Sequence, residues 1–215
     1  NHVLSQILFY QLKLKSFQEA QLKNKWLVKY KEPALNNNIT IGILGVGYLG
    51  SFVGKQLQKY GYNIIGFKNT KPNTNHPFPV FYKKKSIKKF LRQSDIVVCI
   101  LPSTSDTHHM VNRNFLKEMK KKALLINVGR GSTLHEKALV AHLKKYKQFY
   151  ASLDVFEKEP LSKSSSLWKL PNVTITPHIA SLTLVDTAVE YIYKKYKQYK
   201  KNGKIKSDVN LIKGY

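Results

Sequence analysis

A short apolar run, a glycine-rich turn and a helical stretch follow one another in the first third of the chain. The run covers residues 39–44, the turn reads Gly45-Val46-Gly47-Tyr48-Leu49-Gly50, and helical spacing continues to residue 60. The three glycines allow a tight bend, the approach of a phosphate to the backbone, and close packing of helix on strand. The helix N-terminus adds free N–H groups and a partial positive charge. A flexible turn is the alternative, but this context favours a dinucleotide site made by Gly45, Gly47, Tyr48, Leu49 and Gly50.

Strand-like and helical segments alternate along the rest of the chain. Strands are expected at 39–44, 63–67, 96–101, 123–127, 150–154 and 173–175, and helices at 3–22, 49–60, 86–93, 114–121, 134–145 and 184–199. Apolar strands that are joined through helices form a parallel sheet covered on both faces. We therefore expect an α/β fold with a doubly wound, Rossmann-like parallel sheet.

Composition narrows the class of protein further. The 215 residues suit one large domain, or one domain with a piece of another, and 42% hydrophobic residues can bury a core. The single cysteine, Cys99, argues against a disulfide framework or a multi-cysteine zinc site, and we expect no metal. No apolar stretch approaches the ~20 residues of a membrane span. These features predict a soluble protein of the cytoplasm.

The formal charge of +25 raises the question of a nucleic-acid partner. Only three of the 37 basic residues are arginine, although arginine is the residue that best contacts phosphates and guanine edges. Lys, Asn, Ile and Tyr, which A/T-rich codons encode, are all abundant. We interpret the charge as compositional drift and keep nucleic-acid binding as the least favoured alternative. The lysine- and tyrosine-rich helix at 184–199 is then expected to turn Tyr and Ile toward the core.

The end of the second expected strand bears on the choice of cofactor. An acidic residue at this place binds the 2′-hydroxyl of the NAD adenine ribose. Here the sequence reads Gly66-Phe67-Lys68-Asn69-Thr70-Lys71 and contains no carboxylate. Lys68, Thr70 and Lys71 are suited instead to a 2′-phosphate. We therefore expect NADP(H) as the favoured cofactor, with NAD(H) possible.

Three polar motifs follow three of the later strands. They are Asn127-Val128-Gly129-Arg130-Gly131, the segment 153–161 with Asp154 and Glu159, and Thr176-Pro177-His178. In a doubly wound sheet, ligands bind at the carboxyl ends of strands. Each residue alone has an ordinary reading, because Arg130 could cap a loop, Glu159 could end a turn and His178 could lie in the core. Together with the glycine turn, they favour an active site.

These motifs, with Leu101-Pro102-Ser103-Thr104, Leu167-Trp168 and the closing Lys213-Gly214-Tyr215, resemble the D-2-hydroxyacid dehydrogenases over the whole chain. The resemblance implies reduction of small 2-keto acids, such as glyoxylate and hydroxypyruvate, by hydride transfer from NAD(P)H. It implies that Arg130 binds the substrate carboxylate and polarises the keto oxygen, and that His178 donates the proton. Glu159 would hold the His178 ring and raise its pKa.

The resemblance implies further positions and a domain plan. Asp154 would lie near the nicotinamide end of the cofactor, while Leu101, Pro102 and Thr104 would line its groove. Residues 1–30 would form an opening helix that pairs in a homodimer, and residues 31–182 the dinucleotide-binding domain. Residues 183–215 would belong to a flavodoxin-like substrate domain that is mostly missing.

The chain starts at Asn1 with a helical pattern already under way, which favours the loss of an N-terminal part. We therefore expect weak NADPH binding and little turnover from these 215 residues alone. The alternative from another class is a catalytically inert dinucleotide-binding protein, either a truncated remnant or a redox-sensing binding module.

Overall fold

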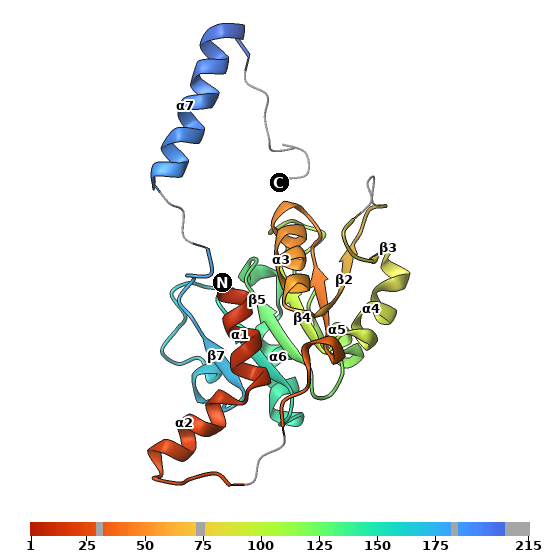
Figure 1. Ribbon diagram of the computed structural model, residues 1–215, viewed down its shortest axis with the longest axis vertical. Helices are drawn as coiled ribbons and strands as arrows, with labels where there is room; N and C mark the ends of the chain where they lie inside the picture. Colours follow the sequence, from red (N-terminus) through yellow and green to blue (C-terminus); the bar gives the residue numbers. More distant parts are fainter. Residues whose placement is uncertain (29–31, 72–75, 182–184, 205–215) are drawn as a thin grey trace.

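A parallel β-sheet of seven strands carries the fold. The computed structural model describes residues 1–28, 32–71, 76–181 and 185–204, and within them the strand order is β3-β2-β1-β4-β5-β6-β7. The strands are β1 (Thr40–Leu44), β2 (Asn63–Lys68), β3 (Val80–Tyr82), β4 (Ile96–Cys99), β5 (Leu124–Asn127), β6 (Tyr150–Leu153) and β7 (Val173–Ile175). The chain winds outward in both directions from β1 (Figure 1). The predicted doubly wound α/β fold is therefore confirmed.

Helices connect these strands and flank the sheet. They are α1 (His2–Gln11), α2 (Leu14–Leu22), α3 (Tyr48–Lys59), α4 (Ile87–Gln93), α5 (Arg113–Glu118), α6 (Glu136–Lys145) and α7 (Val185–Asn202). Short 3-10 turns cover Asn36–Asn38, Lys84–Ser86, Gly131–Thr133 and Ser166–Lys169. None of the helices in the described part of the chain has the length and apolar character of a membrane span.

The apolar side chains of the strands alternate between two cores, one on each face of the sheet. In β4, Val97 and Cys99 belong to one core, and Ile96 and Val98 belong to the other. Because successive side chains of a strand project to opposite faces, both faces need a covering layer. Helices α4, α5 and α6 cover the first face, and α1 and α3 cover the second.

The parallel register brings the functional loops to one edge of the sheet. Leu44 at the end of β1 pairs with Cys99 at the end of β4, and Cys99 pairs with Asn127 at the end of β5. Asn127 in turn pairs with Leu153 at the end of β6. The loops that follow these four strands therefore lie next to one another, as ligand-binding loops do in open α/β sheets.

Two of the expected helices differ in the structure. The opening helix breaks at Lys13, whose φ is +54°, so that α1 and α2 are separate. The expectation that the Tyr and Ile side chains of α7 face the core was wrong, because none of its residues is buried and the helix stands apart from the sheet (Figure 1). An amphipathic pattern indicates that one face of a helix is apolar enough to be buried, but it does not show which part of the protein, if any, buries that face. The closing Lys213-Gly214-Tyr215 lies outside the described residues.

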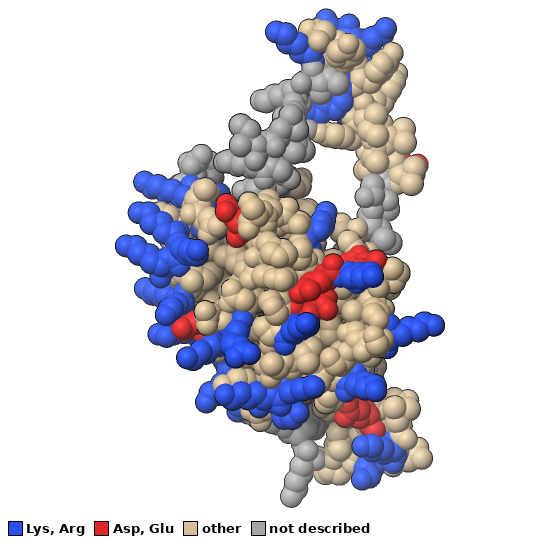
Figure 2. All heavy atoms as spheres, turned by 180° about the vertical axis from the view of Figure 1, so that it is seen from behind, with Lys and Arg blue, Asp and Glu red and all other residues tan. Residues whose placement is uncertain are grey.

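The basic residues are spread widely over the surface. Figure 2 shows many of them on one face, including a group over the α4 region at the left of that view. Lys83, Lys84, Lys85 and Lys89 are exposed there, and the nearby Arg92 pairs with Glu118 at 2.8 Å. This group lies on the surface around α4, away from the loops that the sequence assigns to the chemistry.

Candidate active site

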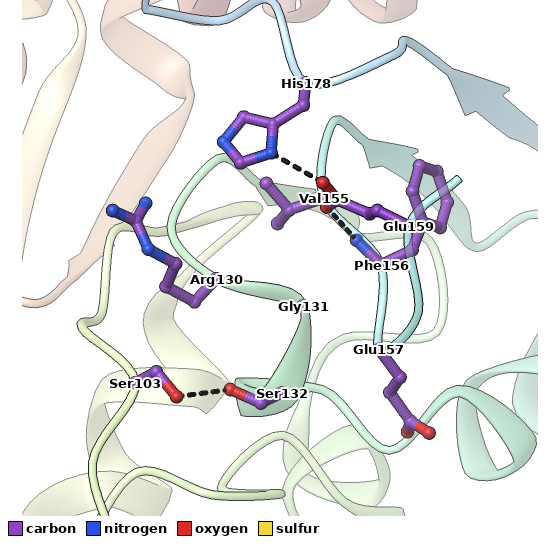
Figure 3. Close-up of a pocket in the computed structure, with 9 residues that line it drawn as sticks. All are labelled: Ser103, Arg130, Gly131, Ser132, Val155, Phe156, Glu157, Glu159 and His178. Atoms are coloured by element: carbon purple, nitrogen blue, oxygen red, sulfur yellow. Dashed lines mark hydrogen bonds and ion pairs between the residues drawn. The ribbon is translucent and has the colours of Figure 1, made fainter. Parts of the chain in front are cut away.

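A cavity of about 280 Å³ opens at the carboxyl edge of the sheet, and it contains all three predicted catalytic side chains (Figure 3). Arg130 comes from the loop after β5, Glu159 from the loop after β6, and His178 from the segment after β7. Three separate loops thus supply one site. The remaining lining residues are Ser103, Gly131, Ser132, Val155, Phe156 and Glu157, which the sequence did not single out as site residues.

His178 and Glu159 form a hydrogen-bonded pair. The Nδ1 atom of His178 lies 2.7 Å from Oε2 of Glu159, and the Phe156 N–H donates to Oε1 of the same carboxylate at 2.9 Å. Burial alone would raise the pKa of Glu159, but these hydrogen bonds and the charge of His178 outweigh it and hold that pKa below its ordinary value. Glu159 is therefore an ionised acceptor for Nδ1–H. The other ring nitrogen of His178 is turned toward the Arg130 side of the cavity (Figure 3).

Asp154 holds the backbone that carries His178. Its carboxylate accepts hydrogen bonds from the N–H groups of Ile179 and Ala180 at 2.9 and 2.8 Å and from the Thr176 hydroxyl. The His178 N–H donates to the Asp154 carbonyl at 2.8 Å, and His178 has a φ of +56°, which costs energy for a residue with a side chain. Burial would raise the pKa of Asp154, but the three hydrogen bonds lower it. At 1% exposure, Asp154 lies beneath the segment and not on the cavity wall.

Arg130 is placed by a turn that packs tightly against the Phe156 backbone. A Cβ atom on Gly131 would lie 1.8 Å from the Phe156 carbonyl oxygen, so only glycine allows this approach. The Arg130 carbonyl accepts a hydrogen bond from the Thr133 hydroxyl at 2.6 Å. Among the residues that the structure describes, no carboxylate pairs with the Arg130 guanidinium. One guanidinium nitrogen donates to the Gly129 carbonyl at 2.8 Å, and the remaining N–H donors are available to an anion in the cavity.

The predicted phosphate-binding turn has the geometry that its glycines require. Gly45 has a φ of +106°, and a Cβ atom on Gly50 would lie 2.0 Å from the Gly45 carbonyl oxygen. A Cβ on Gly47, in contrast, would meet no atom within 4 Å. The turn therefore has no room for a side chain at Gly50, where helix and strand pack, and is open at Gly47, where a phosphate would approach. Tyr48 and Leu49 begin α3 next to the turn, and their side chains are exposed. These residues fit a bound dinucleotide.

Leu101 joins the phosphate-binding turn to the Arg130 loop. A Cβ atom on Gly45 would lie 3.2 Å from a methyl group of Leu101, and one on Gly129 would lie 2.6 Å from the Leu101 carbonyl oxygen. Next to it, the Thr107 hydroxyl donates to the Pro102 carbonyl at 2.6 Å and accepts from the Thr104 N–H at 2.9 Å. These contacts fold the segment after β4 into a closed turn between the two parts of the site.

Lys68 ends β2 half-buried, and Thr70 and Lys71 follow it with exposed side chains. None of the three lines a second cavity, of about 400 Å³, that adjoins the phosphate-binding turn. This second cavity, the α3 cavity, is lined by Val46, Gly47, Tyr48, Ser51, Phe52, Lys55, His76 and Pro77. The sequence did not indicate Lys55 or His76, because residues far apart in sequence form the wall.

A comparison with known families places most of the chain in one of them. Residues 4–180 match the family model described as D-isomer specific 2-hydroxyacid dehydrogenase, NAD binding domain. The chain is 31% identical over 216 residues to a glyoxylate/hydroxypyruvate reductase A of Escherichia fergusonii. That match covers 100% of this chain and 68% of the relative.

Solved structures agree with this assignment. A D-isomer specific 2-hydroxyacid dehydrogenase from Xanthobacter autotrophicus Py2, in complex with NADPH and MES, has a TM-score of 0.91 at 32% identity, covering 100% of this chain and 87% of that one. An NADPH-dependent glyoxylate/hydroxypyruvate reductase from Sinorhizobium meliloti, in complex with NADP and sulfate, has a TM-score of 0.91 at 27% identity, covering 100% and 68%. The chain therefore belongs to the D-isomer specific 2-hydroxyacid dehydrogenases, a family of NAD(P)-dependent enzymes.

Proposed function

We propose that this protein reduces small 2-keto acids, with glyoxylate and hydroxypyruvate as the substrates, to 2-hydroxy acids at the expense of NADPH. One observation carries the proposal: an arginine without a carboxylate partner among the described residues shares a cavity with a His178–Glu159 pair. The arginine can bind the carboxylate of a substrate, and the His178–Glu159 pair can give a proton to its keto oxygen.

Arg130, His178 and Glu159 have different roles in the proposed reaction. Arg130 binds the substrate carboxylate with its fork of donors and polarises the keto oxygen, which concentrates the positive charge of the carbonyl group on carbon. When bound, NADPH supplies the hydride that this carbon accepts. His178 gives the proton of its outward ring nitrogen to the keto oxygen, while Glu159 holds Nδ1 and fixes the ring orientation. Solvent then returns a proton to His178.

The preference for NADPH rests on two kinds of support. The relatives from X. autotrophicus and S. meliloti were crystallised with NADPH and NADP, and the end of β2 carries Lys68, Thr70 and Lys71 in place of an acidic residue. Replacing Lys68 and Lys71 together by Ala should raise the Michaelis constant for NADPH much more than that for NADH. Equal changes for the two cofactors would contradict the assignment of these lysines to the 2′-phosphate.

The activity is tested by following the oxidation of NADPH in the presence of glyoxylate or hydroxypyruvate. Because the chain spans 68% of the E. fergusonii relative, we expect low turnover from the chain alone. Turnover should rise when the uncovered part of that relative, which we expect to precede the matched region, is fused ahead of Asn1. A fusion that binds NADPH but reduces neither acid would favour the inert dinucleotide-binding alternative.

We also propose that the protein is cytoplasmic and forms a homodimer, and that residues 1–30 form part of the dimer interface. Leu22 and Trp26 support this, because they are 86% and 91% exposed and thus offer apolar surface to a partner. Light scattering should report a dimer for the chain and a monomer for Trp26→Lys. A monomeric wild-type chain would contradict this part of the proposal.

A further inference from the structure

The backbone of Phe156 contacts both halves of the catalytic cavity. Its N–H donates a hydrogen bond to Oε1 of Glu159 at 2.9 Å, and the other oxygen of this carboxylate holds His178. The Phe156 carbonyl oxygen faces Gly131, directly after Arg130, where an added Cβ atom would lie 1.8 Å away. A displacement of this one residue would therefore shift groups on both sides of the site, and misplacements of about 1 Å lower reaction rates strongly.

The next residue, Glu157, ties this backbone to the start of α6 through two reciprocal hydrogen bonds. The Glu157 N–H donates to Oε1 of Glu136 at 2.8 Å, and the Glu136 N–H donates to Oε1 of Glu157 at 2.9 Å. Glu136 is the first residue of α6, and an N–H at this position has no acceptor within the helix. Glu157 therefore satisfies the end of the helix and fixes the loop after β6 in the same contact.

This contact brings two carboxylates together, which has an electrostatic cost. Burial and the charge of Glu157 raise the pKa of Glu136 above its ordinary value, although the Glu157 N–H acts in the opposite direction. His109, in the loop after β4, offsets part of this cost. Its Nε2 atom lies 3.1 Å from Oε1 of Glu157, and the ring is positively charged when it is protonated. Glu157 thus has anchors on two other segments of the chain.

His109 is itself held from several sides. Its N–H donates to the carbonyl of Ser132, a residue of the cavity wall, at 2.9 Å. The centre of its ring lies 4.0 Å from that of His108 and 4.7 Å from that of His135. His109 therefore joins the loop after β4 to the loops after β5 and β6, and Glu157 lies where the three loops meet.

We propose that Glu157 is a positioning residue of the active site, which acts through the backbone of Phe156. It fixes the place of Glu159 and, through the contact of Phe156 with Gly131, the place of the Arg130 turn. The Glu157 carboxylate is turned away from the catalytic side chains (Figure 3), so it acts on the site through its neighbours. This inference rests on the proposed function, in which Arg130, Glu159 and His178 carry the reaction.

Nitrogen NMR of the histidine rings in the 215-residue chain tests the inference without turnover. At a pH at which histidine is neutral, the His178 ring should carry its proton on Nδ1, because Glu159 accepts it there, whereas a ring without this partner shares its proton between both nitrogens. Glu157→Ala should shift the His178 signals toward the shared state. Glu157→Gln should keep the wild-type signals, since it retains an oxygen that accepts from the Glu136 N–H.

Two further variants complete this experiment. His109→Ala removes one anchor and leaves Glu157 in place, so it should shift the His178 signals in the same direction but less, and it decides the question if Glu157→Ala does not fold. Lys158→Ala is the matched control, because Lys158 is exposed on the same loop but does not line the cavity, and it should leave the His178 signals unchanged.

Kinetics of the fusion described above supply the second readout. Glu157→Ala should lower kcat for glyoxylate by about tenfold and change the Michaelis constant for NADPH by less than about twofold, since the cofactor turn is untouched. Wild-type His178 signals in Glu157→Ala, or equal effects of Glu157→Ala and Lys158→Ala, would overturn the inference and leave the proposed function intact. A fusion that reduces neither acid would instead overturn the proposed function, while the NMR comparison would still show whether Glu157 holds Glu159 at His178.

Discussion

The catalytic cavity and the phosphate-binding turn lie at the same edge of the sheet but are built by opposite means. In the cavity, Arg130, Glu159 and His178 are proposed to act through their side chains, and the hydrogen bonds of these side chains hold them in place. In the turn, Gly45 and Gly50 act through the side chains that they lack. Removing side-chain atoms should therefore disable the cavity, whereas adding side-chain atoms should disable the turn.

The largest effect should come from removing the chemistry of the cavity. Arg130→Ala and His178→Ala should each lower kcat/KM for glyoxylate in the fusion by about 10²–10⁴-fold, because a charged donor or a proton donor is lost. NADPH affinity, measured by titration, should change by less than about twofold. A comparable loss of NADPH affinity would mean that the two regions are not separate.

Adding one methyl group to the turn should disturb folding and cofactor binding together. Gly50→Ala places a Cβ atom 2.0 Å from the Gly45 carbonyl oxygen, so helix and strand must move apart, at a cost of about 1–3 kcal/mol. Thermal unfolding should occur at lower temperature and NADPH binding should be lost. Gly203→Ala is the control, because a Cβ there meets no atom within 4 Å, although its φ of +63° allows a small cost. A fully stable Gly50→Ala variant that binds NADPH would contradict the packing argument.

Asp154→Asn tests whether the ionised Asp154 carboxylate holds the segment that carries His178. The change should destabilise the protein by about 1–3 kcal/mol at neutral pH, since a buried acceptor of three hydrogen bonds becomes in part a donor. The folded-state pKa of Asp154 is lowered, so its stabilisation is present above the unfolded pKa of about 3.9 and is lost as the pH falls below that value.

Denaturant unfolding of both proteins between neutral pH and pH ~3 measures this effect. The difference between wild type and Asp154→Asn should shrink toward the acid end. A difference that does not change with pH would mean that the ionised carboxylate is not what holds the His178 segment.

The smallest effect is expected where a methyl group meets empty space. Gly47→Ala should leave the unfolding free energy nearly unchanged, because its Cβ has no neighbour within 4 Å and its φ of −97° suits alanine. It should still weaken NADPH binding by about tenfold, because the methyl group occupies the approach of the phosphate. Unchanged NADPH affinity would place the pyrophosphate elsewhere.

Several features were predictable because they depend on local patterns. The glycine turn, its strand and its helix follow from a short stretch of sequence, and the structure has them within one residue of the predicted bounds. Arg130, Glu159 and His178 each follow the carboxyl end of a strand. Because the strands are parallel, these ends lie at one edge of the sheet, and the topology alone brings the three residues to that edge. Their catalytic roles remain predictions that the variants above test.

Other features depend on neighbours that no local pattern contains. The three-residue strand β3 gains its identity from pairing with β2, and its own pattern was too short to indicate it. His109 Nε2 lies 3.1 Å from a carboxylate oxygen of Glu157, and the His109 ring stacks on that of His108 and meets that of His135 at a tilted angle. Long-range contacts of this kind are decided by packing, so periodicity does not reveal them.

The sequence by itself determined the order of all strands except β3, the phosphate-binding turn and the residue types available for chemistry, because backbone propensity and apolar periodicity act over short distances. Only the tertiary structure decided that Asp154 lies beneath the His178 segment, that α7 has no buried residue, and that Lys55 and His76 share one cavity. The physical reason is that burial, cavities and hydrogen-bond partners arise where segments distant in the chain pack together.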